Sequence, residues 1–157
     1  MVGGCAIKAI VFDWGRTLYD SENGALFPET APILAALSRR YRLAIVSLVT
    51  RGDYHARVEE RYAVLRQRGI EDCFAAILFA RADKDRLYAV ALSRLGLEPK
   101  EIAIVDDRAA RGIRWGNRHG ATTIWLRRGK FAGELPDDTG APTHTIGGLR
   151  ELGALPL

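Results

Sequence analysis

The sequence predicts an α/β fold in which a doubly wound, parallel β-sheet carries helices on both faces. Short apolar segments alternate with longer amphipathic segments along the whole chain, which is the pattern of successive β-α-β units. Two of the apolar segments end abruptly at a polar residue, Asp13 or Ser47, as buried parallel strands do at the carboxyl edge of a sheet. No repeat or linker divides the 157 residues, so we expect a single domain over residues 1–157.

Each strand is predicted from consecutive apolar residues, because a strand covered on both faces has no polar side. The expected strands span residues 6–12, 43–47, 75–79, 102–105 and 122–126, with a short further strand at 143–146.

Each helix is predicted from apolar residues spaced by three or four positions, with glycine after the last turn or proline near the first. The expected helices span residues 29–40, 54–68, 83–95 (beginning at Asp83 or Lys84) and 108–119, and a final helical turn follows residue 146.

Composition limits the class of protein and of partner. Hydrophobic residues make up 48% and charged residues 27% of the chain, as in soluble globular proteins. A net charge of +4 suits an anionic ligand. The basic clusters at 39–42 and 127–130 accompany no nucleic-acid motif, so we interpret them as solvated faces. No apolar run approaches a membrane span and no export signal is recognisable. Because Cys5 and Cys73 have no metal or redox spacing, we expect reduced thiols and a cytoplasmic location.

Polar side chains follow several of the predicted strands. Asp13, Ser47 and the pair Asp106-Asp107 come at strand ends, and Lys84 opens the helix after the third strand. Because the carboxyl ends of parallel strands meet at one edge of a sheet, we expect these side chains to converge. A carboxylate can attack phosphorus, a hydroxyl and an ammonium can hold phosphate oxygens, and carboxylate oxygens suit Mg²⁺. The pattern therefore indicates phosphoryl chemistry.

Two of these assignments have alternatives within the chain. Thr50 could replace Ser47 as the hydroxyl, and Arg81 or Lys130 could supply the positive charge in place of Lys84.

Four segments, in this order, resemble the motifs of the haloacid dehalogenase (HAD) superfamily. Residues 12–18, Phe-Asp-Trp-Gly-Arg-Thr-Leu, resemble the first motif, Asp-x-Asp-Gly-Thr-Leu, and residues 45–47, Ile-Val-Ser, resemble the second. Lys84, 23 residues before Asp107, resembles the third-motif lysine, and residues 104–107 resemble the acidic fourth motif. The resemblance covers nearly the whole chain and implies a three-layer, Rossmann-like sheet.

The resemblance implies a phosphatase that acts through an aspartyl-phosphate intermediate. In this interpretation Asp13 is the nucleophile, Ser47 binds the phosphoryl group, and Lys84 orients Asp13 and neutralises the phosphate.

The resemblance also implies Mg²⁺ as the cofactor. Asp13 and the carbonyl of Gly15 would be two of its ligands, and Asp107, with or without Asp106, would complete the site. Either member of the pair could instead cap the following helix.

Several positions depart from the family pattern. Gly15 stands where the family has its general acid, Leu48 where an Asn often follows the second motif, and Gly112 where a further acid often lies. A positioned acid typically contributes about 10²- to 10⁴-fold to the rate, so the resemblance predicts weakened turnover of poor leaving groups. Arg16 replaces the usual Gly; it is either a phosphate clamp or a solvent-facing residue, and we favour the second.

The spacing of the motifs leaves no room for the cap domain of many family members. Only 34 residues separate Asp13 from Ser47, and 37 separate Ser47 from Lys84. An open site fits a bulky phosphorylated substrate, or a homo-oligomer in which a neighbouring subunit covers it. The alternative function is a catalytically inactive binding module with the same fold. A dehalogenase is a third and poorer hypothesis, because it needs a cap and an arginine-lined halide cradle, and the sequence allows neither to be placed.

Overall fold

The computed structural model describes residues 5–157 and contains one main sheet of six strands. These are β1 (Ala9–Phe12), β4 (Arg42–Leu48), β5 (Phe74–Ala80), β6 (Ile102–Asp106), β7 (Thr122–Leu126) and β8 (His144–Ile146). All neighbouring pairs are parallel, and the order is β5-β4-β1-β6-β7-β8. The chain therefore winds outward in both directions from β1, which confirms the doubly wound sheet.

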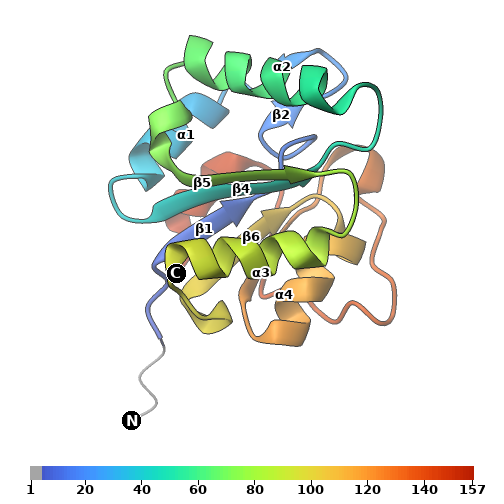
Figure 1. The fold of residues 1–157 in the computed structure, drawn as a ribbon. Helices are drawn as coiled ribbons and strands as arrows, with labels where there is room; N and C mark the ends of the chain where they lie inside the picture. The colour runs from blue at the N-terminus through green and yellow to red at the C-terminus, as the bar shows by residue number, and fades with distance from the viewer. Residues whose placement is uncertain (1–4) are drawn as a thin grey trace.

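Helices cover both faces of this sheet. Helices α1 (Thr30–Leu37) and α2 (Tyr54–Gln67) lie on one face, and α3 (Lys84–Leu95) and α4 (Arg114–His119) lie on the other (Figure 1). The alternation of side chains along a strand explains the two cores. Ile10 and Phe12 of β1 belong to the core that includes α1 and α2, whereas Ala9 and Val11 belong to the core that includes α3 and α4. The three layers are those that the sequence predicted.

One predicted helix is different in the structure. The segment predicted as a helix over 108–119 begins with a π-helical turn, Ala109–Ile113, and only Arg114–His119 is α-helical. The wider turn brings the backbone N–H of Gly112 to 3.0 Å from the carboxylate of Asp106, to which it donates a hydrogen bond. A hydrophobic pattern does not reveal this contact between a side chain and the backbone six residues further along the chain.

Two further elements differ from the prediction. The helix predicted over 29–40 ends at Leu37. The loop after β1 forms a two-stranded antiparallel hairpin, β2 (Tyr19–Asp20) and β3 (Ala25–Leu26), that was not predicted. Its turn is stabilised by the carboxylate of Asp20, which accepts hydrogen bonds from two backbone N–H groups of the turn.

Within residues 5–157 there is no inserted cap. Between β1 and β4 the chain forms only the hairpin and α1, and between β4 and β5 only α2 and a short 3₁₀ turn, Glu71–Cys73. The first four residues of the predicted single domain lie outside the described residues. In the described part of the chain, no helix combines the length and the apolar character that crossing a membrane requires, and Cys5 and Cys73 are both free.

Candidate active site

The carboxyl ends of β1, β4 and β6 bring the side chains of Asp13, Ser47 and Asp106 to one place. The register pairs Phe12 with Ile45 of β4 and with Val105 of β6, so the following residues lie together at the carboxyl edge of the sheet. Asp13 is held there by a backbone hydrogen bond from its N–H to the carbonyl of Val105 at 3.1 Å. The hydroxyl of Ser47 donates to Asp13 Oδ1 at 2.8 Å. The predicted convergence is therefore present.

Lys84 joins this group from the first residue of α3. The helix begins there because Asp83, in the left-handed conformation with φ 61°, accepts a hydrogen bond from the N–H of Arg86 at 3.1 Å. The Lys84 ammonium donates to Asp13 Oδ1 at 3.2 Å and to Asp106 Oδ2 at 2.6 Å. Burial opposes its charge, but the two carboxylates outweigh burial and raise the pKa of Lys84 well above its ordinary value. Lys84 is therefore a fixed positive charge.

The carboxyl group of Asp13 is ionised. Burial favours its neutral form, but the positive charge of Lys84 and the hydrogen bond from Ser47 outweigh burial and lower its pKa below the ordinary value. The side-chain hydrogen bonds of Ser47 and Lys84 both reach Oδ1, so neither occupies Oδ2. The arrangement supplies a buried, charged carboxylate with one oxygen not engaged by either side chain.

The two neighbouring acids after β6 have different surroundings. Asp106 accepts hydrogen bonds from Lys84 and from the backbone N–H groups of Arg108, at 2.9 Å, and Gly112, at 3.0 Å. Both of its oxygens are thus engaged by protein donors. Asp107 is 2% exposed, and neither of its carboxylate oxygens has a hydrogen-bond partner. Its backbone is fixed by the indole N–H of Trp125, which donates to the Asp107 carbonyl at 3.1 Å.

The carboxyl group of Asp107 is buried in this site without a hydrogen-bond partner. Burial, together with the negative charges of Asp13 and Asp106, raises the pKa of Asp107 to about 9. A carboxylate with two buried, unpaired oxygens is costly, and such groups in proteins commonly hold an ion.

The site fits a divalent cation with oxygen ligands. One carboxylate oxygen from each of Asp13, Asp106 and Asp107 lies within 4.8 Å of the others. Asp13, Gly15 and Asp107 also line the same cavity. Because the oxygens of Asp106 already accept from Lys84 and the backbone, Asp107 is the member of the pair that is free to ligate such a cation.

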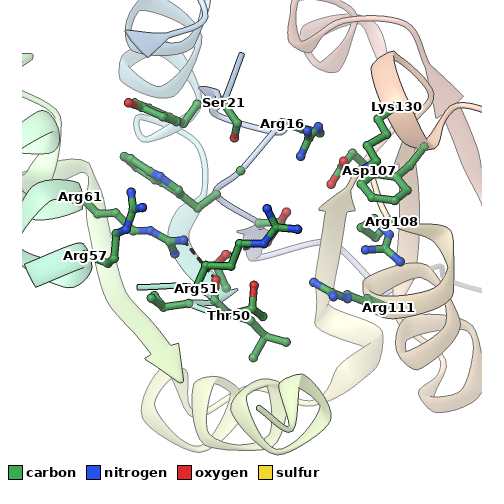
Figure 2. A pocket seen from close by; sticks show the side chains of 18 of the residues that line it. Arg16, Ser21, Thr50, Arg51, Arg57, Arg61, Asp107, Arg108, Arg111 and Lys130 are labelled. Carbon is green, nitrogen blue, oxygen red and sulfur yellow. Dashed lines mark hydrogen bonds between the residues drawn. The ribbon is translucent and has the colours of Figure 1, made fainter. Parts of the chain in front are cut away.

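The cavity beside these carboxylates has a volume of about 620 Å³ and a largely basic wall. Six of the residues that line it are arginines: Arg16, Arg51, Arg57, Arg61, Arg108 and Arg111. Figure 2 shows Arg57 and Arg61 on one side of the cavity and Arg108 and Arg111 on the side of Asp107.

The sequence did not identify this basic wall. The preference for a solvent-facing Arg16 was wrong, because this side chain lines the cavity and its guanidinium lies 5.6 Å from the ring of Phe131. Arg57 and Arg61 were also missed. Their i,i+4 spacing, which places both on one face of α2, was the available signal, and the sequence alone does not say where that face points.

Of the alternatives to Ser47 and Lys84, Thr50 and Lys130 line the same cavity and Arg81 does not. Thr50 lines the cavity but is exposed. Arg81 donates to the backbone carbonyl of Gly52 at 2.6 Å, and no hydrogen bond joins it to Asp13 within residues 5–157.

Two of the positions that depart from the family pattern differ in the space around them. A Cβ atom on Gly15 would lie 3.4 Å from Ser21 Oγ, an ordinary contact, so a Cβ atom fits there. A Cβ atom on Gly112 would lie 2.6 Å from both Asp106 Oδ2 and the Tyr88 hydroxyl. Gly112 is therefore required by packing, whereas glycine at position 15 is not.

Comparison with known proteins places these features in a family. The family model described as HAD-hydrolase-like matches residues 81–152. The chain is 30% identical over 133 residues to a phosphoserine phosphatase of Thermus thermophilus, covering 81% of this chain and 49% of that protein. It is 38% identical over 68 residues to a glyceraldehyde 3-phosphate phosphatase of Methanopyrus kandleri, covering 43% of this chain and 29% of that protein. The chain thus spans about half or less of the length of these curated relatives.

A solved structure agrees with the sequence relatives. The structure of a HAD phosphatase from Thermococcus onnurineus has a TM-score of 0.69 and 18% identity to this chain, covering 94% of this chain and 97% of the other. At this identity the match shows the fold. Taken together with the family model and the phosphatase relatives, it leads to one conclusion: this chain belongs to the HAD-like hydrolase superfamily.

Proposed function

We propose that this protein is a Mg²⁺-dependent phosphatase that hydrolyses phosphate monoesters through an aspartyl-phosphate on Asp13. The observation that carries the proposal is an ionised Asp13, held by Ser47 and Lys84, next to an Asp107 whose two oxygens have no partner. The basic wall of the cavity supports an anionic substrate. The printed names of the two curated relatives, both phosphatases of small phosphate esters, point to the same reaction class.

Lys84 and Ser47 would bind the phosphoryl group through different contacts. The Lys84 ammonium neutralises phosphate charge while its contact with Asp106 fixes its position. The Ser47 hydroxyl, which donates to Asp13 in the absence of substrate, can donate instead to a phosphate oxygen. A Mg²⁺ held by Asp13, Asp107 and the carbonyl of Gly15 would withdraw charge from the phosphoryl oxygens.

The proposed reaction has two steps. A carboxylate oxygen of Asp13 forms a bond to phosphorus as the bond between phosphorus and the leaving oxygen breaks, and that oxygen keeps the electron pair. Because Gly15 offers no acid, the leaving oxygen takes its proton from water. A water molecule then attacks phosphorus, the bond to Asp13 breaks, and inorganic phosphate leaves as the carboxylate is restored. Acyl and aryl phosphates, whose leaving oxygens are weakly basic, are therefore the best substrates.

The direct test compares the wild type with Asp13→Asn. Hydrolysis of acetyl phosphate and p-nitrophenyl phosphate is measured with Mg²⁺ and with a chelator. The proposal expects activity that requires both the metal and Asp13. Asp85→Asn is the matched control, since this exposed acid lies beside Lys84 in α3 but outside the cavity. Activity that survives in Asp13→Asn at the level of the control contradicts the proposal.

A second candidate function is a binding module that does not turn over its ligand. Gly15 favours it, because the general-acid position holds no acid. Equal background rates from the wild type and Asp13→Asn, with retained binding of inorganic phosphate, would support this candidate. The expected cytoplasmic location and a homo-oligomer that covers the open site remain predictions, and sedimentation of the purified protein tests the second.

A further inference from the structure

The cavity contains more positive charge than one phosphate needs. Two of its arginines have carboxylate partners: Arg57 contacts Glu60 at 3.4 Å and Arg108 contacts Glu134 at 3.0 Å. Within residues 5–157, the other cationic residues of the cavity wall form no ion pair; these are Arg16, Arg51, Arg61, Arg111 and Lys130. A phosphate monoester carries about two negative charges at neutral pH, fewer than the five cationic side chains of the wall that form no ion pair.

Arg16 is held in the cavity wall at a structural cost. Its φ of 62° lies in the left-handed region, which favours glycine. Its Nε is buried and has no hydrogen-bond partner, although its guanidinium lies 5.6 Å from the ring of Phe131. Strained backbone and an unpaired buried donor at one residue are features that proteins retain at binding sites.

Arg61 approaches the cavity from α2 and is also incompletely paired. One nitrogen, Nη2, donates to the carbonyl of Leu48 at 3.1 Å. The guanidinium lies over the ring of Phe79, at 4.9 Å, and 5.9 Å from that of Trp14. Its Nη1 is buried and has no partner. The contacts fix the guanidinium, and an anion in the cavity would satisfy the remaining N–H groups.

We propose that the cavity binds a small molecule with two phosphate groups, one presented to Asp13 and the other bound by arginines of the cavity wall that have no carboxylate partner. The inference rests on the proposed function, and it defines the substrate class of that same site. Arginine suits the second phosphate because its planar fork can donate two parallel hydrogen bonds to phosphate oxygens.

The shape of the site favours a small molecule over a nucleic acid. The volume of about 620 Å³ lies within the range of ordinary small-ligand pockets. The unpaired cations Arg16, Arg61 and Arg111 line this one cavity, whereas a nucleic acid requires a basic stripe that follows its backbone.

The experiment measures binding, so it does not depend on turnover. Asp13→Asn is titrated calorimetrically, in the presence of Mg²⁺, with fructose 1,6-bisphosphate and with fructose 6-phosphate, which differ by one phosphate. We expect the bisphosphate to bind at least about 10-fold more tightly, since charge-assisted hydrogen bonds contribute on this scale. Equal affinities for the two sugars would overturn the inference.

Two variants, each added to Asp13→Asn, assign the selectivity to the arginines. Arg16→Gly introduces the residue that its backbone conformation favours, so loss of folding is not expected. Arg61→Gln keeps most of the side-chain stem that packs on Phe79. The variant that removes the arginine holding the second phosphate is expected to reduce the ratio of the two affinities about 10-fold or more, and an unchanged ratio in both variants would overturn the inference. Arg66→Gln is the control, because Arg66 is on α2 but pairs with Glu71 and does not line the cavity; a loss of selectivity in this control equal to that in Arg61→Gln would overturn the inference.

The outcomes separate this inference from the proposed function. If Asp13→Asn prefers the bisphosphate through Arg16 or Arg61 but the wild type hydrolyses no phosphate ester, the proposed function fails and the ligand class stands. If the wild type hydrolyses p-nitrophenyl phosphate but no preference for the bisphosphate is found, only the ligand class fails. Tighter binding of a 5′-phosphorylated oligonucleotide than of the bisphosphate would replace the small molecule with a nucleic acid.

Discussion

Replacing Asp107 by Asn should stabilise the metal-free protein. The carboxyl group of Asp107 is buried without a partner, and its pKa rises from an ordinary 3.8 to about 9. At pH 7 the folded state therefore retains a proton that the unfolded state has released. Each pKa difference of one corresponds to about 1.4 kcal/mol, and pH 7 lies roughly three units above the unfolded pKa, so the ceiling is about 4 kcal/mol. Because the Asn amide is itself a polar group buried without partners, part of this gain is lost, and we expect an increase of about 2 kcal/mol in the free energy of unfolding.

The sign of this effect gives it a characteristic pH dependence. Because the folded state has the raised pKa, the contribution of Asp107 to stability is greatest below about pH 4, where both states are protonated. Between pH 4 and pH 9 the unfolded state loses its proton first, so the wild type loses stability as pH rises. Asn does not titrate. The advantage of Asp107→Asn should therefore be small at pH 4.5 and larger at pH 7.5.

The assay is urea denaturation of both proteins with a chelator at those two pH values, repeated at pH 7.5 with Mg²⁺. Mg²⁺ should stabilise the wild type, since a ligand that binds only the folded state raises its stability, and should stabilise Asp107→Asn much less. Three results refute the reasoning: a variant less stable than the wild type without metal, an advantage that does not grow with pH, or equal stabilisation of both proteins by Mg²⁺.

Three other substitutions test separate parts of the account. Gly15→Asp, whose Cβ atom the surrounding space accommodates, should raise kcat/KM for alkyl phosphates by about 10²-fold or more and for acetyl phosphate much less; equal effects on both substrates would argue against a missing general acid. Gly112→Ala should destabilise the protein by about 1–3 kcal/mol in urea denaturation, because its Cβ would lie 2.6 Å from Asp106 Oδ2; an unchanged midpoint contradicts this. Arg16→Gly should raise the unfolding free energy by up to about 1 kcal/mol through relief of the φ of 62°, and a clear loss of stability would mean that the contacts of Arg16 outweigh its strain.

The parts of the site that the sequence predicted depend on local rules. Asp13 and Ser47 lie at or beyond the ends of buried parallel strands, and adjacent parallel strands present these ends at one edge of the sheet. Lys84 opens a helix at the same edge. A rule about strand ends, combined with motif order, is sufficient to bring these residues together before any tertiary contact is known.

The parts that the sequence did not predict depend on tertiary contacts. The π-helical turn at Ala109–Ile113 exists where Gly112 donates to Asp106. Arg16 turns into the cavity next to Phe131, a residue far along the chain. The different surroundings of Asp106 and Asp107 arise from three donors that reach only the first of them. The pattern of either segment alone does not determine such contacts.

The central claim is that the carboxylate of Asp13 becomes phosphorylated, and mass spectrometry after rapid acid quenching tests it most directly. The wild type is mixed with acetyl phosphate and Mg²⁺, quenched during turnover, and the peptide that contains Asp13 is analysed. The account predicts a phosphoryl group on Asp13 that appears only with the metal and is absent from Asp13→Asn. Steady turnover with an unmodified Asp13, or a phosphoryl group on another residue, would contradict it.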